Sequence, residues 1–160
     1  MPRTSVINFN KKFTITPTIT TTQYTAGDSV GGLLTIDNNA IPNGGAAYIE
    51  AISIADKQAG NTQIDVIVFN ENPSSSTITD NDPVSIHSDD LSKVIGLQSI
   101  STSDYFSVGT PSIAYNSLFS IPLVSIPTSR AVYATLVERG TPTRAVGDLI
   151  VTFHTVWLGS

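Results

Sequence analysis

The chain has 160 residues, of which 40% are hydrophobic and only 13% are charged, and it carries a net charge of −5 without any cysteine. Its length fits a single domain with a sizeable core. The missing cysteines exclude disulfide scaffolds, thiolate metal sites and cysteine nucleophiles. Only eight Lys and Arg residues are present, and they are scattered, which argues against a nucleic-acid partner.

The sequence offers no segment suited to a membrane. Nowhere do eighteen apolar residues run together, and the first twelve residues contain no apolar stretch of the kind found in signal peptides. We therefore expect a soluble protein with no membrane partner. About a quarter of the residues are Ser or Thr, a share that suits a surface covered by uncharged hydrogen-bonding groups.

Apolar residues recur mostly at every second position, which is the period of β-strands. Residues 1–12 depart from this pattern, and we expect them to form an N-terminal arm that extends over an adjacent subunit. The β-sandwich domain is then expected over residues 13–160. Within it, residues 13–20 alternate apolar side chains with Thr. Pro17 cannot donate a ladder hydrogen bond, so this segment is predicted to be an edge strand.

The next strands are predicted at residues 30–36, 48–55 and 62–69. A short polar loop that contains Gly60 separates the last two, and this pattern is typical of a hairpin. Apolar residues lie on both faces of residues 62–69, as in a central strand buried on both sides. We expect this hairpin to form the centre of the core.

One short helix is predicted to follow, capped by Ser88, with Asp89 and Asp90 in its first turn and Gly96 at its end. Further strands are predicted at 97–100, 105–108, 113–118 and 123–126, with a terminal pair at 131–139 and 149–158. About nine short strands and one small helix predict an all-β fold. The expected architecture is a single-domain antiparallel β-sandwich, jelly-roll-like or immunoglobulin-like.

The two histidines give little chemistry. His87 has Ser85, Ser88, Asp89 and Asp90 as neighbours, but a catalytic triad needs groups that converge from separate elements. We interpret His87 as a histidine at the helix entry, beside a capping Ser88. His154 lies on the last predicted strand and is interpreted as a surface or interface residue.

The acidic residues give no clear site either. Asp80, Asn81 and Asp82 offer oxygen ligands, but they lack the glycine and distal glutamate of a calcium loop and are interpreted as a solvated turn. Glu50, Asp65 and Glu138 fall within predicted strands, and a carboxylate pair across a cleft could hydrolyse glycosides. No aromatic cluster accompanies these acids, so we interpret them as structural residues. With each candidate better explained as structural, we predict no catalytic residue, no metal ligand, no cofactor and no enzyme activity.

Two further features have structural interpretations. Gly31 and Gly32 lack the spacing of a phosphate-binding loop and are interpreted as turn and bulge glycines. Trp157 and Leu158 are interpreted as the end of a core strand, with an exposed docking tail as the alternative.

Three segments carry a resemblance to a known family: residues 23–35, residues 52–58 continuing through 65–73, and residues 136–143 with Asp148 and Leu149. They resemble small virion structural proteins of tailed bacteriophages. The resemblance implies a capsid decoration or cement protein on the outer capsid surface of the virion, made in the host cytoplasm. It also implies a homotrimer or homodimer that binds the major capsid protein and has no catalytic residues.

Two alternatives stay open. A receptor- or carbohydrate-binding module of a head or tail fibre would carry clustered exposed aromatic residues, and the candidates are Tyr24, Tyr48, Tyr105 and Tyr115. A hydrolase is the third hypothesis, because Ser, Asp and His are all present.

Overall fold

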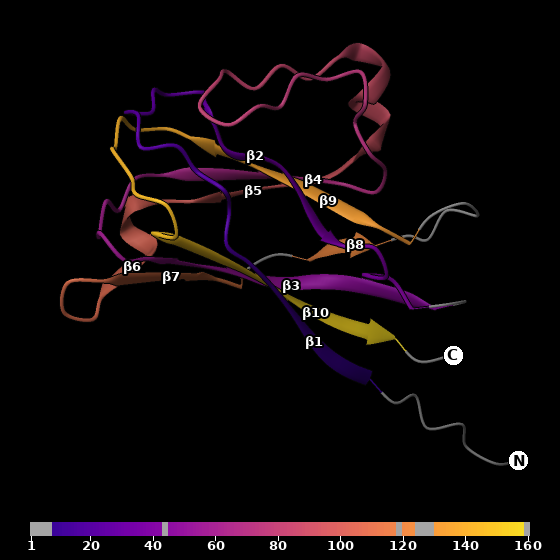
Figure 1. Cartoon of the computed structure of the whole chain (residues 1–160). Coiled ribbons are helices and arrows are strands. Elements are labelled where there is room, and N and C mark those ends of the chain that lie inside the picture. The colour runs from indigo at the N-terminus through magenta and orange to yellow at the C-terminus, as the bar shows by residue number, and fades with distance from the viewer. Residues whose placement is uncertain (1–7, 43–44, 118–119, 124–129, 159–160) are drawn as a thin grey trace, which may run out of the picture.

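Two antiparallel sheets pack face to face in the computed structural model, which describes residues 8–42, 45–117, 120–123 and 130–158 (Figure 1). The larger sheet has six strands in the order β1-β10-β3-β7-β6, with β8 also paired to β3. Its strands are β1 (Asn8–Ile15), β3 (Ala46–Asp56), β6 (Tyr105–Ser107), β7 (Ser112–Asn116), β8 (Ile121–Leu123) and β10 (Leu149–Leu158).

The smaller sheet has four strands in the order β2-β9-β4-β5. They are β2 (Ser29–Asp37), β4 (Ile64–Phe69), β5 (Val94–Ile100) and β9 (Val132–Glu138). Two short 3₁₀ helices, η1 (Ser88–Lys93) and η2 (Thr102–Asp104), precede β5 and β6.

The strand pairing follows a nested order. β1 pairs with β10, β2 with β9, β3 with β7 and β8, and β4 with β5. The first half of the chain is therefore an antiparallel partner of the second half, and the paired halves wrap into two sheets as in a jelly roll. The predicted all-β, jelly-roll-like sandwich is confirmed.

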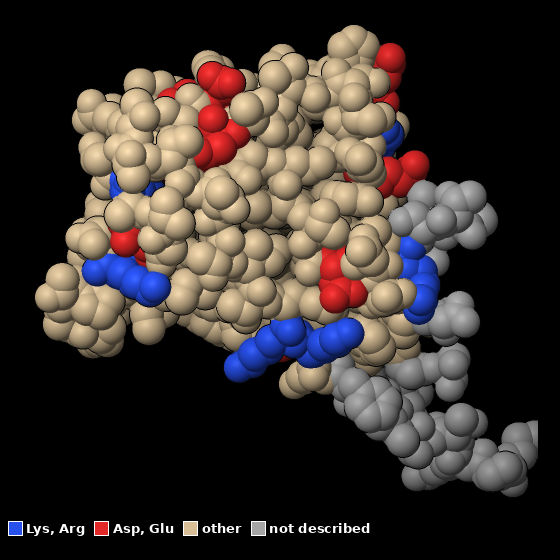
Figure 2. Space-filling view, viewed as in Figure 1, with Lys and Arg blue, Asp and Glu red and all other residues tan. Residues whose placement is uncertain are grey.

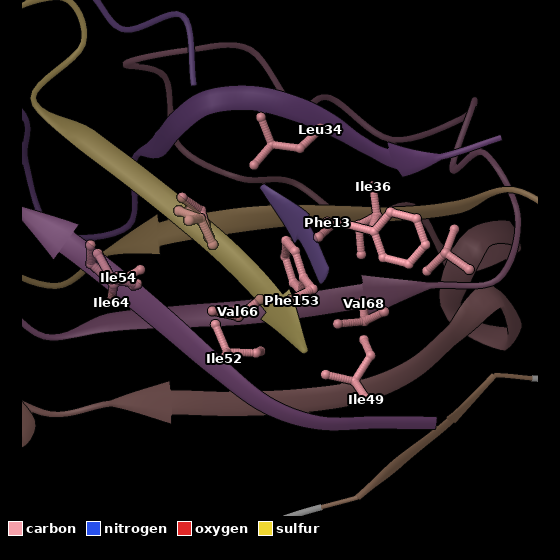
Figure 3. Packing of buried hydrophobic residues seen from close by; sticks show 14 of the residues in the cluster. Phe13, Leu34, Ile36, Ile49, Ile52, Ile54, Ile64, Val66, Val68 and Phe153 are labelled. Carbon is pink, nitrogen blue, oxygen red and sulfur yellow. The ribbon is translucent and has the colours of Figure 1, made fainter. Parts of the chain in front are cut away.

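The core lies between the sheets and is built by every second residue of the strands (Figure 3). The cluster includes Ile52 and Ile54 of β3, Val66 and Val68 of β4 and Phe153 of β10; all five are fully buried. Burial of each such side chain is worth roughly 1.5–3 kcal/mol relative to exposure. The alternation in residues 62–69 therefore identified core positions correctly.

The predicted hairpin between residues 48–55 and 62–69 is wrong. β3 belongs to the six-stranded sheet and β4 to the four-stranded sheet, so their connection crosses from one sheet to the other. The terminal pair is wrong for the same reason, since β9 and β10 also lie in different sheets. A polar loop with a glycine fits a sheet-to-sheet corner as well as a hairpin, and alternation shows which face is buried but not which strand is the neighbour.

The expected N-terminal arm needs correction from Asn8 onward. Residues 8–12 pair with β10 as part of β1, with Lys12 opposite His154, whereas residues 1–7 lie outside the described residues. The strand pattern is hidden because Lys11 occupies an inward position, where its ammonium lies 4.7 Å from the Phe13 ring centroid and 4.6 Å from that of Trp157. β1 is an edge strand as predicted, but it ends at Ile15, before Pro17.

The predicted helix is shorter than expected. It is a 3₁₀ helix that ends at Lys93, and its N-cap is His87, whose side chain accepts a hydrogen bond from the Asp89 amide. Gly96 lies inside β5 and packs against β8: a Cβ atom there would come within 2.7 Å of three side-chain atoms of Ile121.

Replacing Gly96 with Ala is expected to lower the free energy of unfolding by about 1–3 kcal/mol, because Ile121 must shift as a whole. Urea unfolding measures the effect. Ile121→Ala removes the clashing atoms, so the double variant should lose less stability than the two single losses added together. Additive losses would contradict the close packing of β5 on β8.

The outer faces of the two sheets differ. On the four-stranded sheet, the outward residues Phe69, Thr135 and Val137 are buried, because residues 70–93 fold over part of this face and its edge strand β2 (Figure 1). The part beside β5 stays open, where Leu97 is 69% exposed. Across the six-stranded sheet, outward residues such as Tyr115 and Phe106 stay exposed, and no described segment crosses that face. The chain thus leaves one broad sheet face open.

Candidate interaction surface

The outer face of the six-stranded sheet is the candidate functional surface. It is formed by the side chains that alternate with the core residues, and strand register aligns them in rows across the sheet. The outer face includes Lys12, Thr14, Glu50, Ser53, Ala55, Phe106, Ile113, Tyr115, Ile150, Thr152 and His154.

Charge is nearly absent from this outer face. Lys12 and Glu50 are its charged members and cancel, whereas the whole chain carries −5. Figure 2 shows, from the side, small separate groups of charged side chains on a surface that is otherwise uncharged. Depletion of charge is the compositional mark of the central part of protein interfaces.

His154 lies in the middle of the outer face. Its Nε2 atom is 3.2 Å from the Ser53 hydroxyl oxygen, and its ring meets the Tyr115 ring edge-on at a centroid distance of 5.3 Å. Partial burial lowers the pKa of His154, and Lys12 lowers it further, while Glu50 acts in the opposite direction. The neutral imidazole is therefore favoured, which keeps the centre of the outer face uncharged.

The Ser53–His154 contact does not make a nucleophile site. Ser53 lies mid-strand in β3, paired with β10 on one side and β7 on the other. Its neighbouring backbone amides belong to the strand ladders, so they do not converge on a developing oxyanion, as acyl transfer requires.

One edge of the outer face is apolar. Phe106 is 73% exposed, Tyr115 53% and Ile113 44%, and all three lie on the β6–β7 hairpin, in which Phe106 is directly opposite Ile113. Residues 105–116 contain no charged side chain. Exposed aromatic residues on a charge-free hairpin are typical of a contact surface.

The four tyrosines singled out from the sequence do not form one patch. Tyr24 is fully buried, and the Tyr105 hydroxyl is buried too. Tyr48 is half-buried, so Tyr115 alone of the four is well exposed. The second exposed aromatic residue of the patch, Phe106, was not among the candidates.

The three acidic strand residues lie in three different places. Glu50 is on the outer face of the six-stranded sheet, and Asp65 is on the outer face of the four-stranded sheet, paired with Arg139 at 2.6 Å. Glu138 is buried at the end of β9. The pairing of two carboxylates across a cleft that glycoside hydrolysis needs is therefore not formed by these residues.

The histidine and aspartates near η1 hold local structure. His87 caps η1 and lies 3.4 Å from the Asp89 carboxylate. Asp90 is buried and bonded to Lys93 at 2.6 Å and to the Ser76 hydroxyl. Burial opposes ionisation of Asp90, but these bonds outweigh it and hold its pKa below the usual value. Ser88 follows the cap, so the cap expected at Ser88 is one residue earlier.

Asp80 connects three segments of the chain and is not a free ligand in a solvated turn. Its Oδ1 accepts hydrogen bonds from the Tyr24 hydroxyl at 2.7 Å and from the Gly31 amide at 2.6 Å, and its Oδ2 accepts one from the Thr20 amide. Burial and Asp80 together raise the pKa of Tyr24. Among the described residues, no three His, Asp or Glu side chains are placed to hold a metal ion.

Two smaller features lie at the ends of strands β2 and β10. Gly31 and Gly32 have positive φ, and the pairing of β2 with β9 shifts register between Ser29 and Leu33, as expected of bulge glycines. Trp157 packs partly against the core at the end of β10, as predicted, whereas Leu158, expected to share that role, is 38% exposed.

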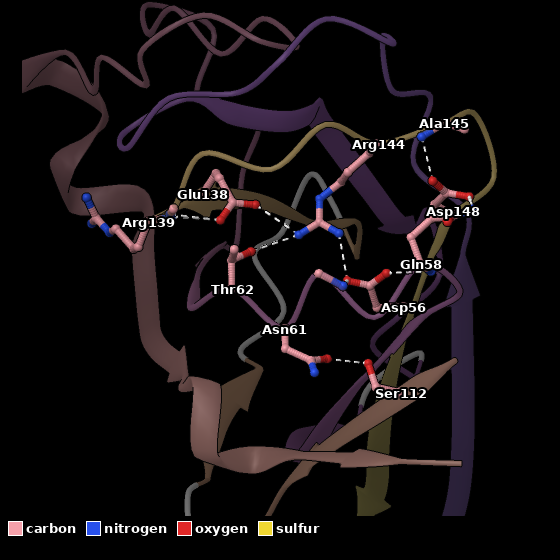
Figure 4. Close-up of polar contacts among 12 residues, drawn as sticks. Asp56, Gln58, Asn61, Thr62, Ser112, Glu138, Arg139, Arg144, Ala145 and Asp148 are labelled. Atoms are coloured by element: carbon pink, nitrogen blue, oxygen red, sulfur yellow. Dashed lines mark hydrogen bonds and ion pairs between the residues drawn. The ribbon is translucent and has the colours of Figure 1, made fainter. Parts of the chain in front are cut away.

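A buried ionic cluster was missed by the sequence interpretation (Figure 4). Arg144, from the β9–β10 connection, binds Asp56 of β3 at 2.8 Å and Glu138 of β9 at 3.0 Å, and it also bonds the Thr62 hydroxyl. All three charged side chains are at most 1% exposed. Burial opposes the charge on Arg144, but the two carboxylates outweigh it and raise its pKa. The cluster joins the two sheets at one end of the sandwich.

No helix within the described part of the chain is long and apolar enough to span a membrane.

No family model matches the chain, and no curated protein matches it by sequence. The solved structures that match it include turnip yellow mosaic virus, at 12% identity over 100% of this chain and 84% of that one, with a TM-score of 0.37. They also include desmodium yellow mottle tymovirus, at 15% identity over 96% and 87% with a TM-score of 0.34, and cocksfoot mottle virus, at 11% over 96% and 84% with a TM-score of 0.31. Likenesses of this size do not assign a function.

Proposed function

We propose that this protein is a virion structural protein, specifically a decoration or cement protein that binds the major capsid protein on the outside of a bacteriophage head as an oligomer. The observation that carries the proposal is the open, nearly uncharged outer face with its exposed apolar hairpin. A jelly roll that covers part of one sheet with its own chain and leaves the outer face of the other sheet open is suited to lie between other surfaces.

The proposed action is stabilisation by contact, without catalysis. Phe106, Ile113 and Tyr115 would lose water against the shell, and burial of a large apolar side chain is worth roughly 1.5–3 kcal/mol. The many identical sites of a shell would raise the overall stabilisation through multivalency. Such a function needs no cofactor, and it places the protein on the surface of the virion.

Binding to purified expanded shells tests the proposal. The wild-type chain should sediment with the shells, and Phe106→Ser should weaken this binding at least tenfold, because an exposed aromatic anchor is lost. The matched control is Leu97→Ser, which removes an equally exposed apolar residue from the other sheet and should leave binding unchanged. Absence of binding, or equal loss in both variants, would contradict the proposal.

A carbohydrate- or receptor-binding module is the second candidate, favoured by the exposed Phe106 and Tyr115 on one hairpin. Aromatic rings on an exposed loop or hairpin can stack on sugars. A glycan-array signal that Tyr115→Ala abolishes, in a protein that does not bind shells, would favour this candidate over the decoration role.

A further inference from the structure

Opposite charges flank the centre of the outer face. Lys12 of β1 is directly opposite His154 of β10, and Glu50 lies at the irregularity of β3 beside His154. Both charges influence the His154 imidazole, in opposite directions. The order across the strands is therefore cation, neutral imidazole, anion.

Neither charge is used within the described part of the chain. Lys12 and Glu50 are absent from the salt bridges among described residues, which involve His87, Asp89, Asp90, Lys93, Asp56, Asp65, Glu138, Arg139 and Arg144. The remainder of the outer face is uncharged. The contacting surface of a partner for this face would therefore be neutral in sum and would present an anion opposite Lys12 and a cation opposite Glu50.

A second copy of the same chain meets this description. We propose that a second copy packs on the outer face about a twofold axis along β10 at His154, so that Lys12 of each copy lies opposite Glu50 of the other. The inference rests on the oligomeric role proposed above and specifies its surface. An isologous contact of this kind uses the same patch on both copies.

The charge pattern selects this axis. A twofold axis along β10 exchanges the two flanking strands, so β1 of one copy covers β3 of the other and the unlike charges meet. An axis along β3 would bring the two Glu50 side chains together, and an axis across the strands would bring the two Lys12 side chains together. Two chains of net charge −5 repel each other, so contact is favoured where the surface is neutral.

The expected dimer is weak. The contact area would cover the three strands β1, β10 and β3, which are spaced about 4.8 Å apart, along the ten residues of β10. This area is roughly 15 Å by 30 Å, or about 450 Å² on each copy. A total near 900 Å² is in the range of transient complexes. We therefore expect a dissociation constant in the micromolar range. Phe106 and Ile113 of the β6–β7 hairpin stay free beyond the edge of the contact, whereas the Tyr115 ring, which meets His154, lies at its border.

Charge-reversal variants of the full chain test this arrangement. The dimer dissociation constant is measured by sedimentation equilibrium at protein concentrations from micromolar to millimolar. Lys12→Glu and Glu50→Lys should each raise the dissociation constant about tenfold, since the symmetry places two such pairs in one dimer. The double variant restores unlike charges and should recover dimerisation. Lys57→Glu, an equal change at an exposed residue outside the face, should have little effect.

A monomeric wild-type chain, or a double variant as weak as the single ones, would overturn the dimer. Circular dichroism and the melting temperature confirm that each variant is folded. Shell binding is measured separately, so the two proposals fail independently. A chain that binds shells as a monomer refutes the dimer and the oligomeric part of the proposed function but leaves shell binding standing, whereas a dimer with the expected charge dependence that does not bind shells refutes the decoration role alone.

Discussion

Arg144→Met is expected to lower the free energy of unfolding by about 3–5 kcal/mol, more than Gly96→Ala or Asp80→Ala. Arg144 is the cation between two fully buried carboxylates, Asp56 and Glu138. Removing it leaves both acids without their ion pair in a site that excludes water. The three side chains join β3, β9 and the β9–β10 connection, so the loss should weaken the contact between the sheets. Urea unfolding followed by Trp157 fluorescence measures it.

Arg139→Met is the matched control. Arg139 makes an ion pair of 2.6 Å with Asp65, but its side chain is 45% exposed, and such pairs contribute less than about 1 kcal/mol. The triple variant Asp56→Asn, Glu138→Gln, Arg144→Met removes all three charges and should recover part of the stability lost by Arg144→Met alone. Equal losses for Arg144→Met and Arg139→Met would show that the buried cluster does not hold the sheets together.

The same cluster shows what the sequence could have revealed. Alternation from Ile52 and Ile54 places Asp56 on the inward face of β3, and alternation from Ala134 and Leu136 places Glu138 on the inward face of β9. A buried carboxylate needs a partner, and few cations are available in a chain with eight Lys and Arg residues. The inward acids were therefore predictable, but the partner was not, because Arg144 lies in a connection without periodicity.

Strand positions were predicted better than strand neighbours. The segments that became β2, β3, β4, β9 and β10 were all identified within one or two residues, because their alternation reflects burial of one face. Pairing is nonlocal in a jelly roll, where β1 meets β10 across the whole chain. Loop composition carries no information about such partners, so both expected local pairs were wrong.

The candidate surface was predictable only in its composition. Scarcity of charge is visible in the sequence, but which sheet face is left nearly uncharged depends on the register of β1, β10, β3 and β7. That register also brings Tyr115 and Ser53 to His154. The interpretation of His154 as a surface or interface residue is consistent with its half-buried position on the open face.

Asp80→Ala is the second large effect, with an expected loss of about 2–4 kcal/mol. The substitution removes the acceptor for the Tyr24 hydroxyl and for the Gly31 and Thr20 amides. Tyr24 is fully buried, so its hydroxyl would be left without a partner away from water. Segment 70–93 would keep its backbone hydrogen bonds to Gly27 and Ser29 but lose the Asp80 side-chain bonds that also hold it to β2, so amide exchange at Gly31 and protease cleavage within the segment should both accelerate.

Asp82→Ala is the control, because Asp82 lies in the same turn but is exposed and makes no side-chain bond to a described residue. Adding Tyr24→Phe to Asp80→Ala removes the stranded hydroxyl and should recover about 1 kcal/mol. If Asp80→Ala and Asp82→Ala behaved alike, segment 70–93 would be held by other contacts. If the Asp80 side chain does hold segment 70–93 in place, its removal exposes the edge strand β2. The Asp80→Ala variant should then aggregate on warming through this edge. The outer face of the six-stranded sheet should keep its dimer contact.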